Sequence, residues 1–284
     1  MKSPATAILI VATLLISFNI SAQEAFVSPK LEKVWSTPEG LNVPESACFR
    51  AEDKTIYVSN IVGMHNIKDG IGYISKLNDK GEFIEKEWVK GLNAPKGIVC
   101  TKRKLYVSDI DRVVEVNLKT GKIEKTYSNR KSQSLNDVTV ASNGQVYISD
   151  SSGNCIFQVG KDSLEVFLES DQLGAMNGIL AIDNLLYLGS KGNFIAIDQK
   201  TKAITIVAEN AGYLDGIVMI GNKFITSDFK GKVQLIEPGK NIEMLMNTSE
   251  LKVNAADLGF IPSQNLLLVP TFLDNKVVAF KLKL

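Results

Sequence analysis

The sequence predicts an all-β protein, a six-bladed β-propeller with four antiparallel strands in each blade, and three observations support this prediction. A phrase of two apolar strands occurs six times, beginning at Glu45, Lys96, Asn136, Asn177, Asp215 and Asp257, with steps of 51, 40, 41, 38 and 42 residues. Short blocks rich in Val, Ile and Tyr alternate with Gly, Asn, Asp and Lys, which is typical of strands and turns. The last repeat is also one strand short, and a strand near the start of the chain can supply it.

The third repeat contains all four expected strands in order. They are residues 137–142 (DVTVAS), 145–150 (QVYISD), 155–160 (CIFQVG) and 164–169 (LEVFLE). The first repeat is longer because a loop within residues 60–75 (NIVGMHNIKDGIGYIS) follows its second strand. The last repeat ends after its third strand, and LEKVWS (31–36) is similar to the fourth strands of other repeats. We therefore expect residues 31–36 to complete the last blade, which closes the ring and removes open sheet edges.

The first 22 residues are predicted to be a secretory signal peptide. Lys2 precedes an apolar run from Ala7 to Ile20, and small or polar residues follow at 21–23. This order is typical of export signals, and the run is too short to span a membrane comfortably. We expect residues 23–284 to form a single propeller domain in an exported protein, either periplasmic or secreted.

Composition excludes several classes of function. Lys and Arg total 32 against 31 for Asp and Glu, and this balance argues against nucleic acid or anionic membranes as partners. With His65 as the only histidine and no CxxC motif, a zinc site of the His/Cys type and a Ser-His-Asp triad are disfavoured. Cys48, Cys100 and Cys155 lie in apolar strand segments and are interpreted as buried free thiols. We expect a monomer, without a membrane span, that binds a small molecule.

Two polar positions recur in the repeats, and they lead to different predictions. A Ser-Asp-like step ends the second strand of four repeats, at Ser59-Asn60, Ser108-Asp109, Ser149-Asp150 and Ser227-Asp228. Because it recurs, we expect a structural role in capping turn N–H groups. The first residue of each phrase, the lead position, instead varies among acids, amides and one Lys. It begins the innermost strand at the mouth of the central channel, where carboxylate and amide oxygens suit a hard cation and a carboxylate can act as a general base.

The phrases PESACF, LNDV, MNGIL and LDGIV resemble motifs of the gluconolactonase/regucalcin (senescence marker protein) family. The resemblance extends over residues 31–284 and implies a six-bladed propeller with one divalent metal on its axis, calcium in first place and zinc or manganese as alternatives. It implies that Glu45, Asn177 and Asp215 bind the metal, that Asn136 helps to hold metal or substrate, and that Asp215 also acts as general base. The implied reaction is hydrolysis of a sugar lactone or a similar small ester.

Two departures from the family pattern leave a second hypothesis open. Ser134 stands where the family often has an Arg that faces the substrate, and Lys96 brings a positive charge to a lead position. Lys96 would repel a cation, or it would bind an anionic substrate group or the oxyanion that forms on ring opening. The alternative is a non-catalytic propeller that binds a small molecule or a protein partner. In it, Lys96 forms an axial ion-pair network with Glu45 and Asp215 instead of a metal site. His65 lies in a loop of the kind that shapes ligand sites, and we expect its side chain to be solvated.

Overall fold

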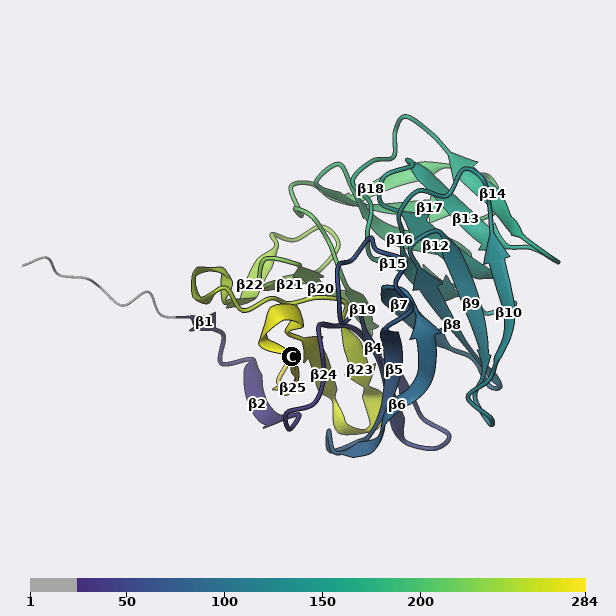
Figure 1. Ribbon diagram of the computed structural model, residues 1–284. Helices are drawn as coiled ribbons and strands as arrows, with labels where there is room; N and C mark the ends of the chain where they lie inside the picture. Colours follow the sequence, from purple (N-terminus) through teal and green to yellow (C-terminus); the bar gives the residue numbers. More distant parts are fainter. Residues whose placement is uncertain (1–24) are drawn as a thin grey trace, which may run out of the picture.

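Six antiparallel sheets follow one another along the chain in the computed structural model, which describes residues 25–284 (Figure 1). Each sheet is one blade of a six-bladed β-propeller, so the predicted fold is confirmed. The predicted signal peptide, residues 1–22, lies outside the described residues. Within residues 25–284, no helix has the length and apolar character needed to cross a membrane.

The first five blades each take their four main strands from consecutive segments. Blade 1 consists of β3 (Pro44–Arg50), β4 (Thr55–Asn60), β5 (Gly72–Asn78) and β6 (Phe83–Leu92), and blade 2 of β7 (Pro95–Cys100), β8 (Lys104–Asp109), β9 (Arg112–Asn117) and β10 (Ile123–Ser128). Blade 3 consists of β11 (Leu135–Val140), β12 (Val146–Asp150), β13 (Cys155–Val159) and β14 (Leu164–Glu169), and blade 4 of β15 (Ile179–Ile182), β16 (Leu185–Ser190), β17 (Asn193–Asp198) and β18 (Ile204–Ala208). Blade 5 consists of β19 (Ile217–Ile220), β20 (Lys223–Asp228), β21 (Lys232–Ile236) and β22 (Glu243–Asn247).

The last blade joins both ends of the described chain, as expected. It contains β23 (Gly259–Ile261), β24 (Leu266–Pro270) and β25 (Val277–Leu282), and β2 (Leu31–Ser36) pairs antiparallel with β25 as its outermost strand. A further strand, β1 (Phe26–Val27), pairs with β22 and gives blade 5 a fifth strand. This strand could not be predicted from the sequence, because two residues are too short to show an alternating pattern.

Apolar clusters between neighbouring blades form the core. Successive side chains of a strand point to opposite faces of its sheet, so Ile56 and Val58 pack toward blade 6 while Tyr57 packs toward blade 2. All three side chains are fully buried, and each such burial contributes roughly 1.5–3 kcal/mol. The prediction of buried thiols holds for Cys155 but not for the other two cysteines. Cys48 and Cys100 are only partly buried, and their sulfur atoms lie 2.9 Å apart.

Glycine follows the lead residue where inner strands crowd the propeller axis. A Cβ atom on Gly216 would lie 2.1 Å from the backbone nitrogen of Leu258, and one on Gly178 would lie 2.3 Å from the carbonyl oxygen of Asp215. No side chain fits at such distances, so only Gly allows the strands to approach this closely. The close approach brings the lead side chains of different blades together.

The Ser-Asp step is structural, as predicted, but its two residues have different structural roles. The carboxylate of Asp150 accepts the N–H groups of Gln133 (2.7 Å) and Ser134 (3.0 Å), in the loop that leads into β11. Ser149 Oγ accepts the N–H of Asp137 (3.1 Å) in its own blade and donates to the carbonyl of Asn177 (2.5 Å) in the next blade. The Asp therefore caps a loop, whereas the Ser links two blades.

We expect Ser149→Ala to lower the free energy of unfolding by about 1–3 kcal/mol, because it leaves a buried N–H and a buried C=O without partners. Ser163→Ala is the matched control, since the Ser163 side chain is exposed on a turn, and it is expected to change stability by less than about 0.5 kcal/mol. Urea denaturation followed by tryptophan fluorescence measures both. Equal stability of the two variants would contradict the inter-blade role of Ser149.

Candidate functional site

A cavity of about 640 Å³ lies at the end of the propeller where the inner strands begin. It brings together all five residues that the sequence analysis selected, namely Glu45, Lys96, Asn136, Asn177 and Asp215. The rest of its lining is Ile61, His65, Ser134, Ser151, Tyr213, Asp228, Phe229, Lys230 and Phe272. The polar residues come from five different blades, so only the closed ring assembles them.

The strand register explains why the five lead side chains converge. Glu45, Lys96 and Asn136 are each the second residue of an innermost strand, in β3, β7 and β11. Asn177 and Asp215 lie two residues before β15 and β19. Because equivalent positions of a propeller face a common axis, these side chains meet although they are about forty residues apart.

Hydrogen bonding of the two Asn side chains uses their amide nitrogen atoms, and oxygen atoms are left free in this cavity. Asn136 donates its amide nitrogen to Ser151 Oγ (3.0 Å), and Asn177 donates its amide nitrogen to Asp215 Oδ1. Among the described residues that line this cavity, three buried atoms then have no hydrogen-bond partner: Glu45 Oε2, Asn136 Oδ1 and Asp215 Oδ2. A buried acceptor without a donor costs about 1–3 kcal/mol, and more when it is charged, so such a group needs an explanation.

A cation would satisfy these oxygen atoms. Two carboxylates and two amides form an all-oxygen donor set, which suits a hard cation such as calcium or magnesium better than a soft metal. Among residues 25–284 there is no group of three or more His, Cys, Asp or Glu side chains arranged to hold a metal. The amides of Asn136 and Asn177 are therefore essential to any metal site here.

Burial and mutual repulsion oppose ionisation of the acids. The pKa of Glu45 is raised well above its ordinary value, first by burial and then by the charges of Asp215 and Asp257, while Lys96 lowers it. The pKa of Asp215 is also raised by burial and by Asp257, against the hydrogen bond from Asn177. A positive charge between Glu45 and Asp215 would reverse these shifts.

Lys96 faces the same cavity without pairing with its acids. Its side chain is 7% exposed, and burial lowers its pKa although Glu45 raises it. Among the described residues, no carboxylate oxygen lies within 4.0 Å of its ammonium nitrogen. No direct ion pair therefore joins Lys96 to Glu45 or Asp215 in this part of the chain.

The assignment of Asp257 to the sixth lead position is wrong. Ser227 Oγ donates to the carbonyl of Ala256 (2.7 Å), as Ser149 does to that of Asn177, so Ala256 is the equivalent residue. Asp257 lies one position further along and accepts a hydrogen bond from Ser46 Oγ (2.5 Å). It lines a second cavity of about 300 Å³ that extends along the later residues of the inner strands. The similarity of Asp257 to Asp215 in residue type does not fix the strand register, and the register decides which residue is equivalent.

Several cavity residues were missed or misread from the sequence. Asp228 belongs to the Ser-Asp column, but it accepts the N–H of Lys230 (2.7 Å) and lines the cavity. Tyr213 lies two residues before Asp215, and its pKa is raised to about 12 by burial and by the charge of Asp215. Phe229 and Phe272 meet edge to face with ring centroids 4.9 Å apart. Phe229 directly follows Asp228, where the other Ser-Asp steps are followed by Ile61, Ile110 and Ser151. An aromatic residue at this position is the one signal in the sequence that could have found this rim.

His65 and Ser134 are further lining residues of the cavity. His65 is exposed, as expected, but it also lines the cavity. Ser134, which stands where the resembling family often has Arg, lines the cavity too. The loop inserted in blade 1 therefore contributes to the wall of the candidate site.

Comparisons with known proteins give the fold and no family. No family model matches the chain, and no curated protein matches it. Similar solved structures include a streptogramin B lyase (13% identity, 89% of this chain and 97% of that chain, TM-score 0.62). A nidogen/laminin complex is similar over 77% of this chain and 84% of that chain (15% identity, TM-score 0.63). The WD40 β-propeller domain of Doa1 is similar over 84% of this chain and 78% of that chain (12% identity, TM-score 0.62). Identities this low establish a shared propeller fold alone.

Proposed function

We propose that this protein is an exported hydrolase, gluconolactonase-like in mechanism, that opens a lactone or a similar small ester with the help of one divalent cation. Glu45, Asn177 and Asp215 hold the cation, and Asn136 completes the donor set. The observation that supports this proposal is the convergence of three buried, unpartnered oxygen atoms on one cavity. Calcium fits the all-oxygen donor set, with manganese and zinc as alternatives.

The chemistry follows from the positions of the side chains. The cation that Glu45, Asn177 and Asp215 would hold would, when bound, polarise the ester carbonyl as a Lewis acid. Asp215 would accept a proton from the attacking water, because its Oδ2 lines the cavity without a hydrogen-bond partner. Asn177 holds Asp215 in place through its amide nitrogen. Lys96 places a positive charge beside the oxygen on which negative charge develops.

The aromatic rim favours an ester with an apolar substituent over a polyhydroxylated sugar lactone. Phe229, Phe272 and Ile61 line the cavity together with Tyr213, and they offer few hydrogen-bond partners for sugar hydroxyls. Apolar walls around a few convergent polar groups are typical of sites for small, largely apolar ligands. We therefore expect alkyl- or aryl-substituted lactones to be hydrolysed with a lower KM than sugar lactones.

Isothermal titration with calcium, manganese and zinc tests the proposal first. We expect one cation to bind per chain, with release of protons, because Glu45 and Asp215 have raised pKa values and must be ionised to act as ligands. Affinity should fall as the pH is lowered from about 8 to about 5, since protons then compete for the carboxylates. Titration in two buffers of different ionisation enthalpy measures the proton release. Absence of binding for all three cations would overturn the metal site.

Enzymatic turnover is the second part of the test. Lactone opening, followed by the acid it releases, should stop when the cation is removed with a chelator and return when it is restored. Turnover that is indifferent to chelation would contradict a cation-dependent reaction.

A further inference from the structure

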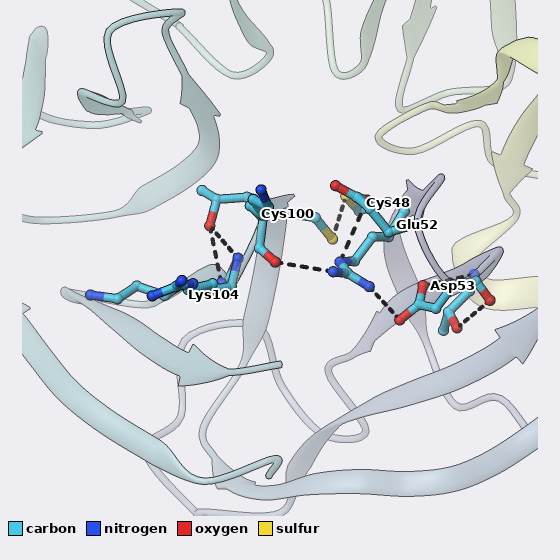
Figure 2. Close-up of polar contacts among 10 residues, drawn as sticks. Cys48, Glu52, Asp53, Cys100 and Lys104 are labelled. Atoms are coloured by element: carbon cyan, nitrogen blue, oxygen red, sulfur yellow. Dashed lines mark hydrogen bonds and ion pairs between the residues drawn. The ribbon is translucent and has the colours of Figure 1, made fainter. Parts of the chain in front are cut away.

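The thiols of Cys48 and Cys100 meet at the interface between blades 1 and 2. Cys48 is on β3 and Cys100 on β7, 52 residues apart in the chain, and their sulfur atoms are 2.9 Å from each other. Figure 2 shows the two side chains pointing toward one another. Both pack against the apolar cluster that contains Tyr57, Ile98 and Leu105, which fixes their strands relative to each other.

We propose that Cys48 and Cys100 are a disulfide-forming pair that covalently joins blades 1 and 2. Two sulfur atoms already in contact need little backbone movement to form a bond. Neither thiol contributes to the cavity with Glu45 and Asp215, so this site is separate from the candidate hydrolase site. Cys155 lies buried in blade 3 and takes no part, because its sulfur is directed to the carbonyl of Ile156 (3.7 Å).

The pair is accessible from the second cavity. Cys48 lines that cavity of about 300 Å³, together with Phe49 and Val99. An incoming oxidant therefore meets Cys48 first, and Cys100 is the thiol that resolves the intermediate. This arrangement of one accessible and one neighbouring resolving thiol suits stepwise exchange.

The oxidant is a disulfide, either a small-molecule disulfide or the disulfide of a dithiol oxidase. The Cys48 thiolate attacks one sulfur of that disulfide, forms a mixed disulfide and releases one thiol. The Cys100 thiolate then attacks the Cys48 sulfur and releases the second thiol. Two protein thiols are oxidised and lose two protons, and one disulfide is reduced to two thiols.

Charged side chains near the two thiols affect the pKa of Cys100, and the rate of thiol–disulfide exchange depends on this pKa. Arg50 contacts Asp53 (2.7 Å) and Glu52 (3.6 Å), and it donates to the carbonyl of Lys102 (3.0 Å) on blade 2; Figure 2 labels the two acids beside the thiols. Burial and the hydrogen bond shared with Cys48 raise the pKa of Cys100, while the charge of Arg50 lowers it. Because the thiolate is the nucleophile, the exchange should accelerate as the pH rises.

The test is equilibration of the native, purified chain with a glutathione buffer rich in glutathione disulfide, followed by mass spectrometry. We expect the chain to lose two hydrogens in mass, its free thiols to fall from three to one, and a Cys48–Cys100 peptide to appear with Cys155 still alkylated. The melting temperature should rise by roughly 5–10 °C on oxidation, because the bond closes a loop of 52 residues.

Three variants provide the controls. Cys155→Ala should form the bond as the parent does, whereas Cys100→Ala and Cys48→Ala should each keep two free thiols and show no oxidant-dependent rise in melting temperature. Three free thiols at equilibrium in the oxidising buffer, a bond to Cys155, or a bond between two chains would overturn the proposal. This readout does not depend on cation binding or hydrolysis.

Discussion

Replacement of Asp215 by Asn is expected to weaken cation binding by at least about 100-fold and to lower lactone turnover by at least about 1,000-fold. The substitution keeps the shape of the side chain but removes its charge. Asn177 donates its amide nitrogen to Asp215 Oδ1, so the new amide must turn its oxygen toward Asn177. Its NH₂ group then faces the cavity in place of the unpartnered Oδ2, where it repels a cation.

Stability distinguishes this loss of function from unfolding. The pKa of Asp215 is raised in the folded protein, so ionising this group at neutral pH costs folding free energy in the absence of a cation. Asp215→Asn should therefore be at least as stable as the parent at pH 7 without metal. This advantage should vanish below the ordinary pKa of Asp, where both states bind the proton. Denaturant unfolding at pH 7 and pH 3 measures the difference.

Asp162→Asn is the matched control for Asp215→Asn. The Asp162 carboxylate is 76% exposed and contacts only Lys125, so its removal should leave cation affinity unchanged. Unaltered cation binding in Asp215→Asn would place the cation away from the axial cavity and remove Asp215 from the mechanism.

The fold could be predicted because its signal is local and repeated. Each strand of blade 3 carries its own apolar pattern and turn residues, and the repeat fixed the blade order without any long-range information. The closing strand β2 was predictable because its sequence is similar to other fourth strands. The two residues of β1, by contrast, carry no period and were missed.

The only site residues that could be predicted from the sequence are those at equivalent positions of the repeats. Glu45, Asn136 and Asn177 occupy equivalent positions, so spacing along the chain placed them on one axis. Asp257 shows the limit, because a shift of one residue moves a side chain from the candidate site to the second cavity. Phe229 and Phe272, and likewise the thiol pair Cys48 and Cys100, lie on different blades and meet only when neighbouring blades pack together.

Lys96→Met distinguishes the hydrolase from a metal-free axial network. If Lys96 faces a cation held by Glu45 and Asp215, removing its charge should tighten cation binding by about tenfold at about pH 8, where the carboxylates compete less with protons. Turnover should nevertheless fall by about 100-fold, because the charge beside the developing oxyanion is lost. Tighter binding with slower chemistry is the combination that a merely structural Lys would not produce.

Lys230→Met supplies the control for charge alone. Lys230 lines the same cavity but is exposed, so water and salt screen its effect, and cation affinity should change less than about twofold. If Lys96→Met instead lowers the free energy of unfolding by several kcal/mol and leaves cation affinity unchanged, the ammonium is the partner of the axial carboxylates. The effect of this single substitution therefore distinguishes a propeller whose axial carboxylates bind a catalytic cation from one in which Lys96 neutralises those carboxylates.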